Sequence, residues 1–116
     1  MKGPWFYIVS DAEVEGHFQP SIKDIQQSVC RQFPRVTIGD MISDRRNGEI
    51  IIPRHIAMYL ARKLTPKSSP VIGKHFGKRD HTTALYAYRK IDRLRATDPK
   101  IAKVVADVHH ELGCAL

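Results

Sequence analysis

The chain has 116 residues, which fits a single domain with one hydrophobic core and is too short for a core plus a nucleotide-binding engine. Its 19 lysines and arginines exceed its 12 aspartates and glutamates, and the resulting formal charge of +7 is typical of proteins that meet polyanions. Residues 1–20 hold one lysine and three acidic residues, or −2, which leaves 18 basic and nine acidic residues, or +9, for the rest. On charge alone, a basic surface that is merely solvated explains these numbers equally well.

Cysteine usage and hydropathy bear on the compartment. Cys30 and Cys114 stand far apart and lack C-x-x-C spacing, so two free thiols in a reducing cytoplasm are expected. The apolar run at residues 5–9 is too short to span a membrane and lacks the layout of a signal peptide. The sequence therefore predicts a cytoplasmic protein without membrane contact.

Apolar residues recur with helical spacing after residue 20. Ser21 and Asp24 resemble a capping box for a first helix that Pro34 stops. A short second helix is expected over residues 37–43, and a charged loop follows at residues 44–49.

The third helix is placed by a proline. The three isoleucines at 50–52 have no partner run at hairpin spacing, so no strand is predicted there. Pro53 fits the first turn of a helix that Thr65 and Pro66 end. The pattern predicts an inward apolar side and an outward basic side; the inward residues are Ile56, Leu60 and Leu64, and the outward residues are Arg54, Arg62 and Lys63.

Three further helices complete the predicted fold. Ser69 and Pro70 open a short one, and a long one starts near His81 with an apolar arc opposite a polar arc. A last helix begins at Asp98-Pro99, and Gly113 ends it. The expected fold is all-α, a compact helical bundle, with an N-terminal arm of uncertain structure at residues 1–20, one domain at residues 21–112 and a tail at residues 113–116.

The turn at residues 76–83, Phe-Gly-Lys-Arg-Asp-His-Thr-Thr, is the most informative segment. Gly77 can take the positive φ that ends one helix, and Asp80 can cap the next by accepting a backbone N–H. The polar residues at the front of that next helix carry groups that read base edges. The segment therefore predicts a helix-turn-helix and sequence-specific binding to double-stranded DNA.

An ordered series of motifs adds a family resemblance. Residues 25–33, 53–61, 64–65, 72–73, 76–83 and 89–91 resemble the C-terminal DNA-binding domain of the bacterial replication initiator DnaA, a Trp-repressor-like helix-turn-helix. The likeness covers residues 21–112, and two departures stand out. The family usually has Gln where His55 stands and a second Gly where Lys78 stands.

The resemblance implies recognition of a DnaA box of the TTATNCACA type. It implies base contacts in the major groove from Asp80, His81 and Thr82, although helix capping or plain solvation explains each of these residues without DNA. It implies that Arg46 enters the minor groove. Ser69 and Pro70 match positions near the groove, and helix starting explains them equally well. Phosphate contacts are implied for seven residues, each of which also reads as a solvated side chain: Arg54, His55, Arg62, Thr65, Thr83, Tyr86 and Lys90.

Several chemistries have no motif in the sequence. It contains no G-x-x-x-x-G-K-[ST] phosphate loop, so no ATPase activity is expected. No paired Cys/His spacing predicts a metal, no catalytic constellation predicts an enzyme, and no cofactor or small-molecule substrate is implied.

Two hypotheses follow. The first is a stand-alone, nucleoid-associated DNA-binding protein that occupies DnaA-box-like sites, competes with full-length DnaA, and regulates replication initiation or transcription. The second is a protein-interaction module on the same helical scaffold, which would bind its partner through the aromatic run at residues 5–9. Packing of that run on the protein's own core is the other interpretation of the same residues.

Overall fold

The structure is a computed structural model that describes residues 20–113. The aromatic run, Cys114 and most of the predicted arm and tail lie outside the described residues. The described part is helical, without strands, as the all-α prediction requires. Its six helices are α1 (Ile22–Gln32), α2 (Ile38–Ile42), α3 (Gly48–Leu64), α4 (Ser69–His75), α5 (His81–Thr97) and α6 (Pro99–Glu111).

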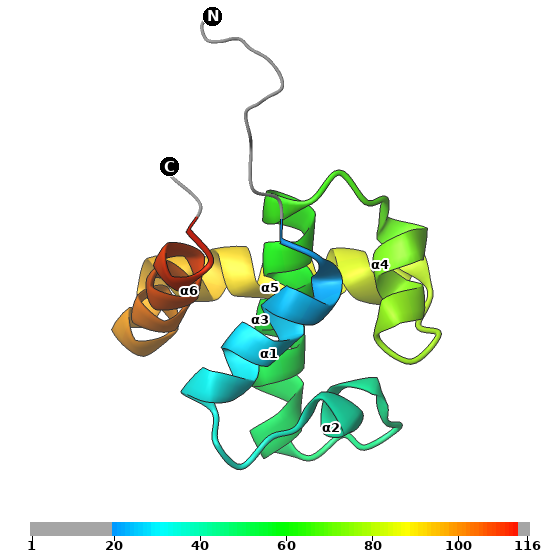
Figure 1. Cartoon of the computed structure of the whole chain (residues 1–116), viewed down its shortest axis with the longest axis horizontal. Helices are drawn as coiled ribbons and strands as arrows, with labels where there is room; N and C mark the ends of the chain where they lie inside the picture. The colour runs from blue at the N-terminus through cyan, green and yellow to red at the C-terminus, as the bar shows by residue number, and fades with distance from the viewer. Residues whose placement is uncertain (1–19, 114–116) are drawn as a thin grey trace, which may run out of the picture.

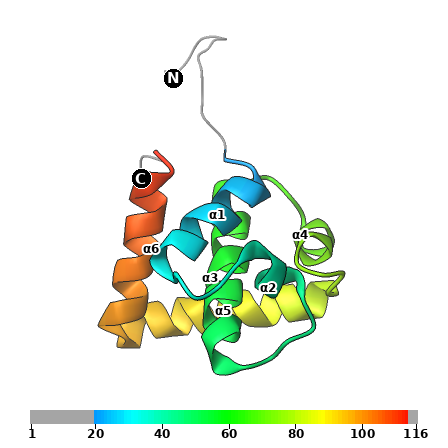
Figure 2. The same ribbon diagram turned by 60° about the horizontal axis from the view of Figure 1, so that its bottom comes forward.

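Helix α3 is the central element. Figure 1 shows it running through the middle of the molecule with α1 in front of it and α5 crossing behind it. The turned view in Figure 2 keeps the same arrangement, with α6 and α4 on opposite flanks. The core fills the space where α1, α4 and α5 meet α3. Its fully buried side chains include Ile25, Ile56, Leu60, Ile72, Phe76 and Ile91.

Side-chain caps fix where most helices begin. The predicted capping box is present at α1, where Ser21 Oγ accepts from the Asp24 N–H at 3.0 Å and Asp24 returns the bond. Thr37 and Asp40 form a second box at α2. Ser68 caps α4, so Ser69 and Pro70 occupy the first turn of that helix.

The predicted start of α3 is wrong. The helix begins at Gly48, and Pro53 lies in its interior instead of its first turn. The Asn47 carbonyl accepts from the N–H groups of Ile50 and Ile51, and Ile50 is buried in the core. Packing of this extra turn therefore extends the helix upstream of the proline, although Pro53 cannot donate the bond that the Glu49 carbonyl would otherwise accept.

The helix-turn-helix consists of α4, a tight turn and α5. Gly77 has φ +90°, as predicted, and a Cβ there would lie 2.1 Å from the Ile42 carbonyl oxygen. A Cβ at Gly73 would lie 2.1 Å from the Arg79 carbonyl oxygen. Lys78 follows with φ +62°, a left-handed conformation that costs a side-chain-bearing residue free energy. The turn thus places α4 against the residues before α5 at a distance that only glycine permits.

The strain at Lys78 generates a stability prediction. Replacing Lys78 with glycine is expected to raise the free energy of unfolding by about 0.5–1 kcal/mol, because glycine adopts φ +62° without a Cβ penalty. Gly77→Ala is the matched contrast, and it should lower the free energy of unfolding because its Cβ meets backbone. Urea unfolding of the three chains measures both effects, and a destabilised Lys78→Gly would contradict the strain argument.

Candidate nucleic-acid interface

The front of α5 presents three polar residues. Asp80 is the N-cap, and His81 and Thr82 form the first turn; all three are exposed. Asp80 Oδ1 accepts from the Thr83 N–H at 3.0 Å and from the Thr83 hydroxyl at 3.2 Å. Oδ2 takes part in neither bond. Capping and base contact, which the sequence presented as alternatives for Asp80, are therefore compatible.

Hydrogen bonding also sets the charge of Asp80. The bonds from the Thr83 backbone and hydroxyl, together with the charge of His81, hold the pKa of this carboxyl below its usual value. The carboxylate is therefore ionised at neutral pH and acts only as an acceptor. An acceptor of this kind matches the amino group of cytosine in the major groove.

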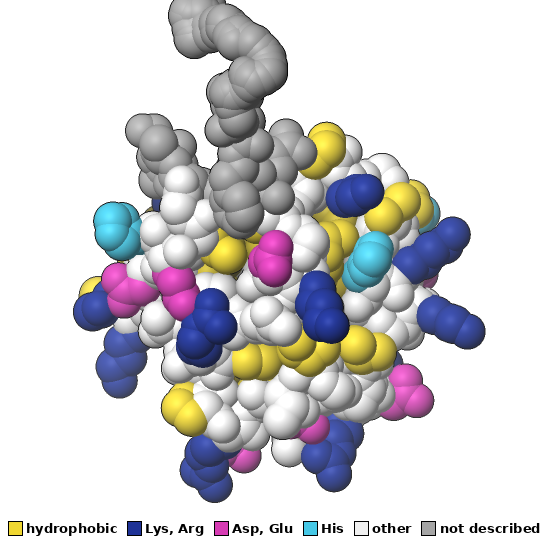
Figure 3. Space-filling model, in the orientation of Figure 1, with side chains coloured by type: hydrophobic (Ala, Val, Ile, Leu, Met, Phe, Trp, Pro, Cys, Tyr) yellow, Lys and Arg dark blue, Asp and Glu magenta, His cyan; other side chains and the backbone are white. Residues whose placement is uncertain are grey.

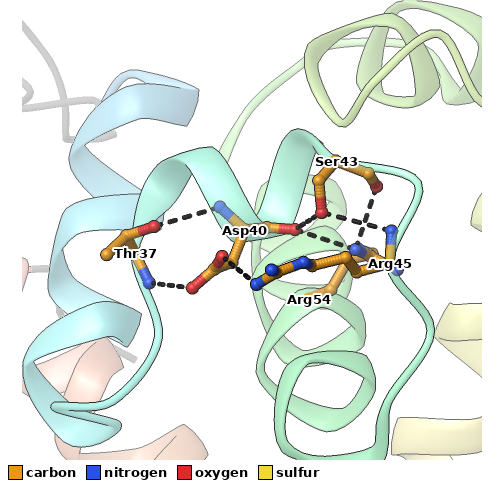
Figure 4. Close-up of polar contacts among 5 residues, drawn as sticks. All are labelled: Thr37, Asp40, Ser43, Arg45 and Arg54. Carbon is orange, nitrogen blue, oxygen red and sulfur yellow. Dashed lines mark hydrogen bonds and ion pairs between the residues drawn. The ribbon is translucent and has the colours of Figure 1, made fainter.

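The loop between α2 and α3 lies beside the recognition turn. Arg46 is exposed in this loop. The Arg54 guanidinium holds the start of the loop, where its Nη2 donates to the carbonyls of Asp40 at 2.9 Å and Ser43 at 3.1 Å, and its Nε donates to that of Met41 at 2.9 Å. Figure 4 shows this side chain reaching from α3 to the end of α2.

The outward orientation predicted for Arg54 is wrong. The residue is only 2% exposed, and its guanidinium faces main-chain carbonyls. Burial, followed by the charges of Arg79 and Arg46, lowers the pKa of Arg54 to about 10, so it is still protonated at neutral pH. The side chain supports the loop that carries Arg46. A phosphate contact from Arg54 stays an untested prediction, and its donors would have to leave these carbonyls to make it.

A second arginine, which no sequence motif marked as functional, joins the loop to the turn. Arg79 Nη2 donates to the Ser43 carbonyl at 2.8 Å, and its Nη1 donates to that of Phe76. The Ser43 carbonyl therefore accepts from both Arg54 and Arg79. The only sequence signal was the position of Arg79 between the hinge glycine Gly77 and the cap Asp80.

Asp40 completes the support of this loop. Its carboxylate closes the capping box with the Thr37 N–H at 3.0 Å and lies 3.5 Å from Arg45 Nη1. Ser43 Oγ also accepts from the Arg45 N–H at 3.2 Å. Figure 4 shows these contacts converging on the end of α2, with Arg45 and Arg54 approaching Asp40 from different elements. The residues just before Arg46 are thus held by side chains from α2 and α3.

Three of the predicted phosphate-contacting residues gather where α3 faces α5. The rings of His55 and Tyr86 meet edge to face with centroids 5.8 Å apart, and Lys90 Nζ lies 5.9 Å from the Tyr86 ring. Tyr86 is 57% exposed. Arg62 is also exposed, and its guanidinium lies 4.7 Å over the ring of Tyr88. Arg62, Tyr86 and Lys90 therefore offer donor groups at the surface.

Two other predicted phosphate contacts have engaged hydroxyls. Thr65 donates to the Ala61 carbonyl at 2.6 Å as α3 ends, and Thr83 donates to Asp80. Ser69 is partly exposed and Pro70 exposed at the start of α4. The DNA contacts of these four residues remain predictions.

His55 is buried where the sequence placed a surface contact. The residue is 7% exposed, and its Nδ1 has no hydrogen-bond partner among the described residues. Burial, followed by the charges of Lys90, Arg54 and Arg79, lowers the pKa of His55 to about 4. The imidazole is therefore neutral at pH 7 and brings no charge to the surface.

Residues 20–113 lack the features of two other kinds of site. No group of three or more His, Cys, Asp or Glu side chains there lies close enough to hold a metal ion. None of the helices in this range is long and apolar enough to cross a membrane. Cys30 is a free thiol, and burial followed by the charge of Asp40 raises its pKa.

The depressed pKa of His55 predicts an acid-sensitive stability. In the unfolded chain His55 binds a proton near pH 6.5, and in the folded chain only near pH 4. The contribution of neutral His55 to the free energy of unfolding is therefore fully present above pH 6.5 and is lost as the pH falls toward 4. Over this window the loss from His55 is on the order of 3 kcal/mol. His55→Gln should abolish this pH-dependent loss of stability. Urea unfolding at pH 7 and near pH 4.5 compares the two chains, and equal losses in both would contradict this role of His55.

Comparisons with known proteins identify the family. The family model described as "Bacterial dnaA protein helix-turn-helix" matches residues 22–91, which is more than half of the chain. The chain is 46% identical over 92 residues to the chromosomal replication initiator protein DnaA of Lactiplantibacillus plantarum, covering 79% of this chain and 20% of the relative. It is 41% identical over 110 residues to that of Rhodopseudomonas palustris (strain TIE-1), covering 90% and 23%. The chain thus spans about a fifth of these relatives' length, and it belongs to the bacterial DnaA helix-turn-helix family.

Proposed function

We propose that this chain binds double-stranded DNA in a sequence-specific manner at DnaA-box-like sites. The observation that carries the proposal is the pairing of two exposed elements on one rigid frame. The polar front of α5 lies beside the loop that presents Arg46, and Arg79 bonds the loop to the turn before α5. A helix tip and a neighbouring arginine loop match the two grooves of one duplex.

The major-groove reading rests on the three residues at the tip of α5. Oδ2 of Asp80 accepts from a cytosine amino group, while Oδ1 continues to cap the helix. His81 donates to a base-edge acceptor, and Thr82 offers a hydroxyl together with a methyl group that suits the C5-methyl of thymine. Exposure of all three residues supports this assignment.

The minor-groove reading rests on Arg46. An A/T-rich minor groove is narrow and concentrates negative potential, which attracts a guanidinium. The loop that carries Arg46 is held at its start by Arg54 and Arg79. The loop is therefore preorganised, and DNA binding needs little further entropic cost to order it. The remaining surface donors, Arg62, Tyr86 and Lys90, bind phosphates and set the register of the protein on the duplex.

We also propose a regulatory role, in which the chain competes for DnaA boxes by occupying them. A box covered by this chain is closed to a full-length initiator that reads the same site, whether the box lies at an origin or in a promoter.

Sequence preference tests the proposed function. Fluorescence anisotropy with a duplex carrying TTATCCACA should show at least about tenfold tighter binding than with a scrambled duplex, or roughly 1.4 kcal/mol. Affinity for both should fall steeply with added salt as phosphate counterions are released. Equal affinity for the two duplexes would reject sequence reading, and binding insensitive to salt would reject the nucleic-acid interface.

Single substitutions separate base reading from phosphate binding. His81→Ala or Thr82→Ala should cost about 1–3 kcal/mol on the box duplex and leave binding to the scrambled duplex nearly unchanged. Lys90→Ala should weaken both duplexes alike and reduce the salt slope by about one unit. The same anisotropy assay measures all three, and equal losses of His81→Ala on both duplexes would contradict base contact by His81.

A further inference from the structure

One groove is lined by no residue of α5, although its lining includes Thr65, a predicted phosphate contact. It has a volume of about 790 Å³ and is formed by the start of α1, helix α2, the segment that joins α3 to α4, and the end of α4. Its apolar wall includes Ile38, Ile42 and Pro66. In Figure 3 hydrophobic side chains gather near the middle of the face shown, with basic side chains and a histidine around them.

Ile42 makes this groove unusual. Among the described residues only Ile42 and Tyr86 are exposed large hydrophobic side chains, at 43% and 57%. Tyr86 belongs to the proposed DNA face, whereas Ile42 lines the groove and is not among the residues proposed to contact DNA. An isoleucine exposed on the wall of a groove of this size fits a surface that an apolar segment covers.

The chain itself supplies a segment of the right kind beside the groove. Pro20, the first described residue, is buried and lines the groove. Only ten residues separate it from the run at residues 5–9, Trp-Phe-Tyr-Ile-Val. Ten residues reach about 33 Å when extended, which is ample for the run to turn back onto its own exit point.

The charges beside the apolar run and around the groove also favour contact between them. The residues between the run and Pro20 include Asp11, Glu13 and Glu15 and no lysine or arginine. The groove is lined by Lys23 and Lys67, neither of which joins an ion pair within residues 20–113. An acidic link that follows an apolar run thus complements an apolar groove with a basic rim.

We infer that residues 5–9 pack into this groove of their own chain, with Trp5 and its aromatic neighbours against Ile42. A buried aromatic side chain removes 150–250 Å² of apolar surface from water, so two of them account for the driving force of docking. The inference goes beyond DNA binding and does not rest on it. A chain that docked the run without preferring box DNA would support the inference while rejecting the proposed function.

Trp5 is the only tryptophan of the chain, so its fluorescence reports on this segment alone. With excitation beyond the tyrosine band, the native full-length chain should emit at shorter wavelength than the chain unfolded in guanidinium chloride, and acrylamide should quench it severalfold less. Ile42→Asp should restore the emission and quenching of an exposed tryptophan. Circular dichroism and the urea midpoint verify that this surface variant remains folded.

Tyr86→Ala is the matched control, because it removes the other exposed large hydrophobic side chain and leaves the groove intact. Its Trp5 should stay protected. A Trp5 as accessible in the native chain as in the unfolded one would overturn the inference, and so would protection that survives Ile42→Asp. Protection that disappears on dilution would also overturn it, because the run would then occupy the groove of a second copy.

Discussion

The burial of the Arg54 guanidinium is the interaction on which the proposed recognition face depends. Removing a charge from water costs several kcal/mol, and the cost is offset only when hydrogen bonds satisfy the group. Arg54 obtains three such bonds from the carbonyls of Asp40, Met41 and Ser43. Those carbonyls belong to the end of a helix and the residue after it, where few intrahelical donors remain, although the Asp40 carbonyl also accepts from the N–H and hydroxyl of Ser43. The carbonyls therefore satisfy the donors of the buried guanidinium, and Arg54 in turn holds the end of α2.

Helix α2 depends on the hydrogen bonds from Arg54 because it has only five residues. A helix of that length does not form on its own in water, since nucleation outweighs the few bonds that it gains. Its capping box with Thr37 and Asp40 closes one end, and Arg54 holds the other. The Ser43 carbonyl then extends the support to Arg79, which stands one residue before the cap of α5. The loop of Arg46 and the tip of α5 are thus fixed relative to each other through one carbonyl oxygen.

The sequence predicted the elements whose cause is local. Gly77 and Asp80 located the start of α5 because a positive φ and an N-cap are each specified by one residue. Pro53 was misleading for the opposite reason. Its usual place is the first turn, and only packing of Ile50 against the core shows that the helix begins upstream. Local rules gave the helices, and tertiary contacts set one of their ends.

The orientation of Arg54 and the burial of His55 were beyond sequence reasoning. A helical wheel assigns arginine outward because a charge is costly inside, and the compensating acceptors here are main-chain carbonyls that carry no sequence signature. A phosphate contact was expected from His55 because its position matches one that the family resemblance assigns to phosphate binding. Its neighbours Tyr86 and Lys90 come from α5, far along the chain, and the proximity that lowers its pKa exists only after α5 packs on α3. Exposure at a functional face is a property of the fold, which a residue's type does not determine.

Repulsion among the arginines at the loop also affects the proposed recognition face. Burial is the main cause that lowers the pKa of Arg54 and Arg79, and the charge of Arg46 lowers both further, so the three guanidinium groups interact at the loop. Arg54 and Arg79 are hydrogen-bonded to main-chain carbonyls, whereas within residues 20–113 Arg46 forms no hydrogen bond or ion pair through its side chain. Nearby carboxylates oppose this repulsion, because the charge of Asp44 raises the pKa of both Arg79 and Arg54 and the charge of Asp40 raises that of Arg54. Under the proposed function, phosphates on both sides of a minor groove would surround Arg46 and offset the repulsion that remains, so Arg54 and Arg79 would favour binding through their effect on Arg46.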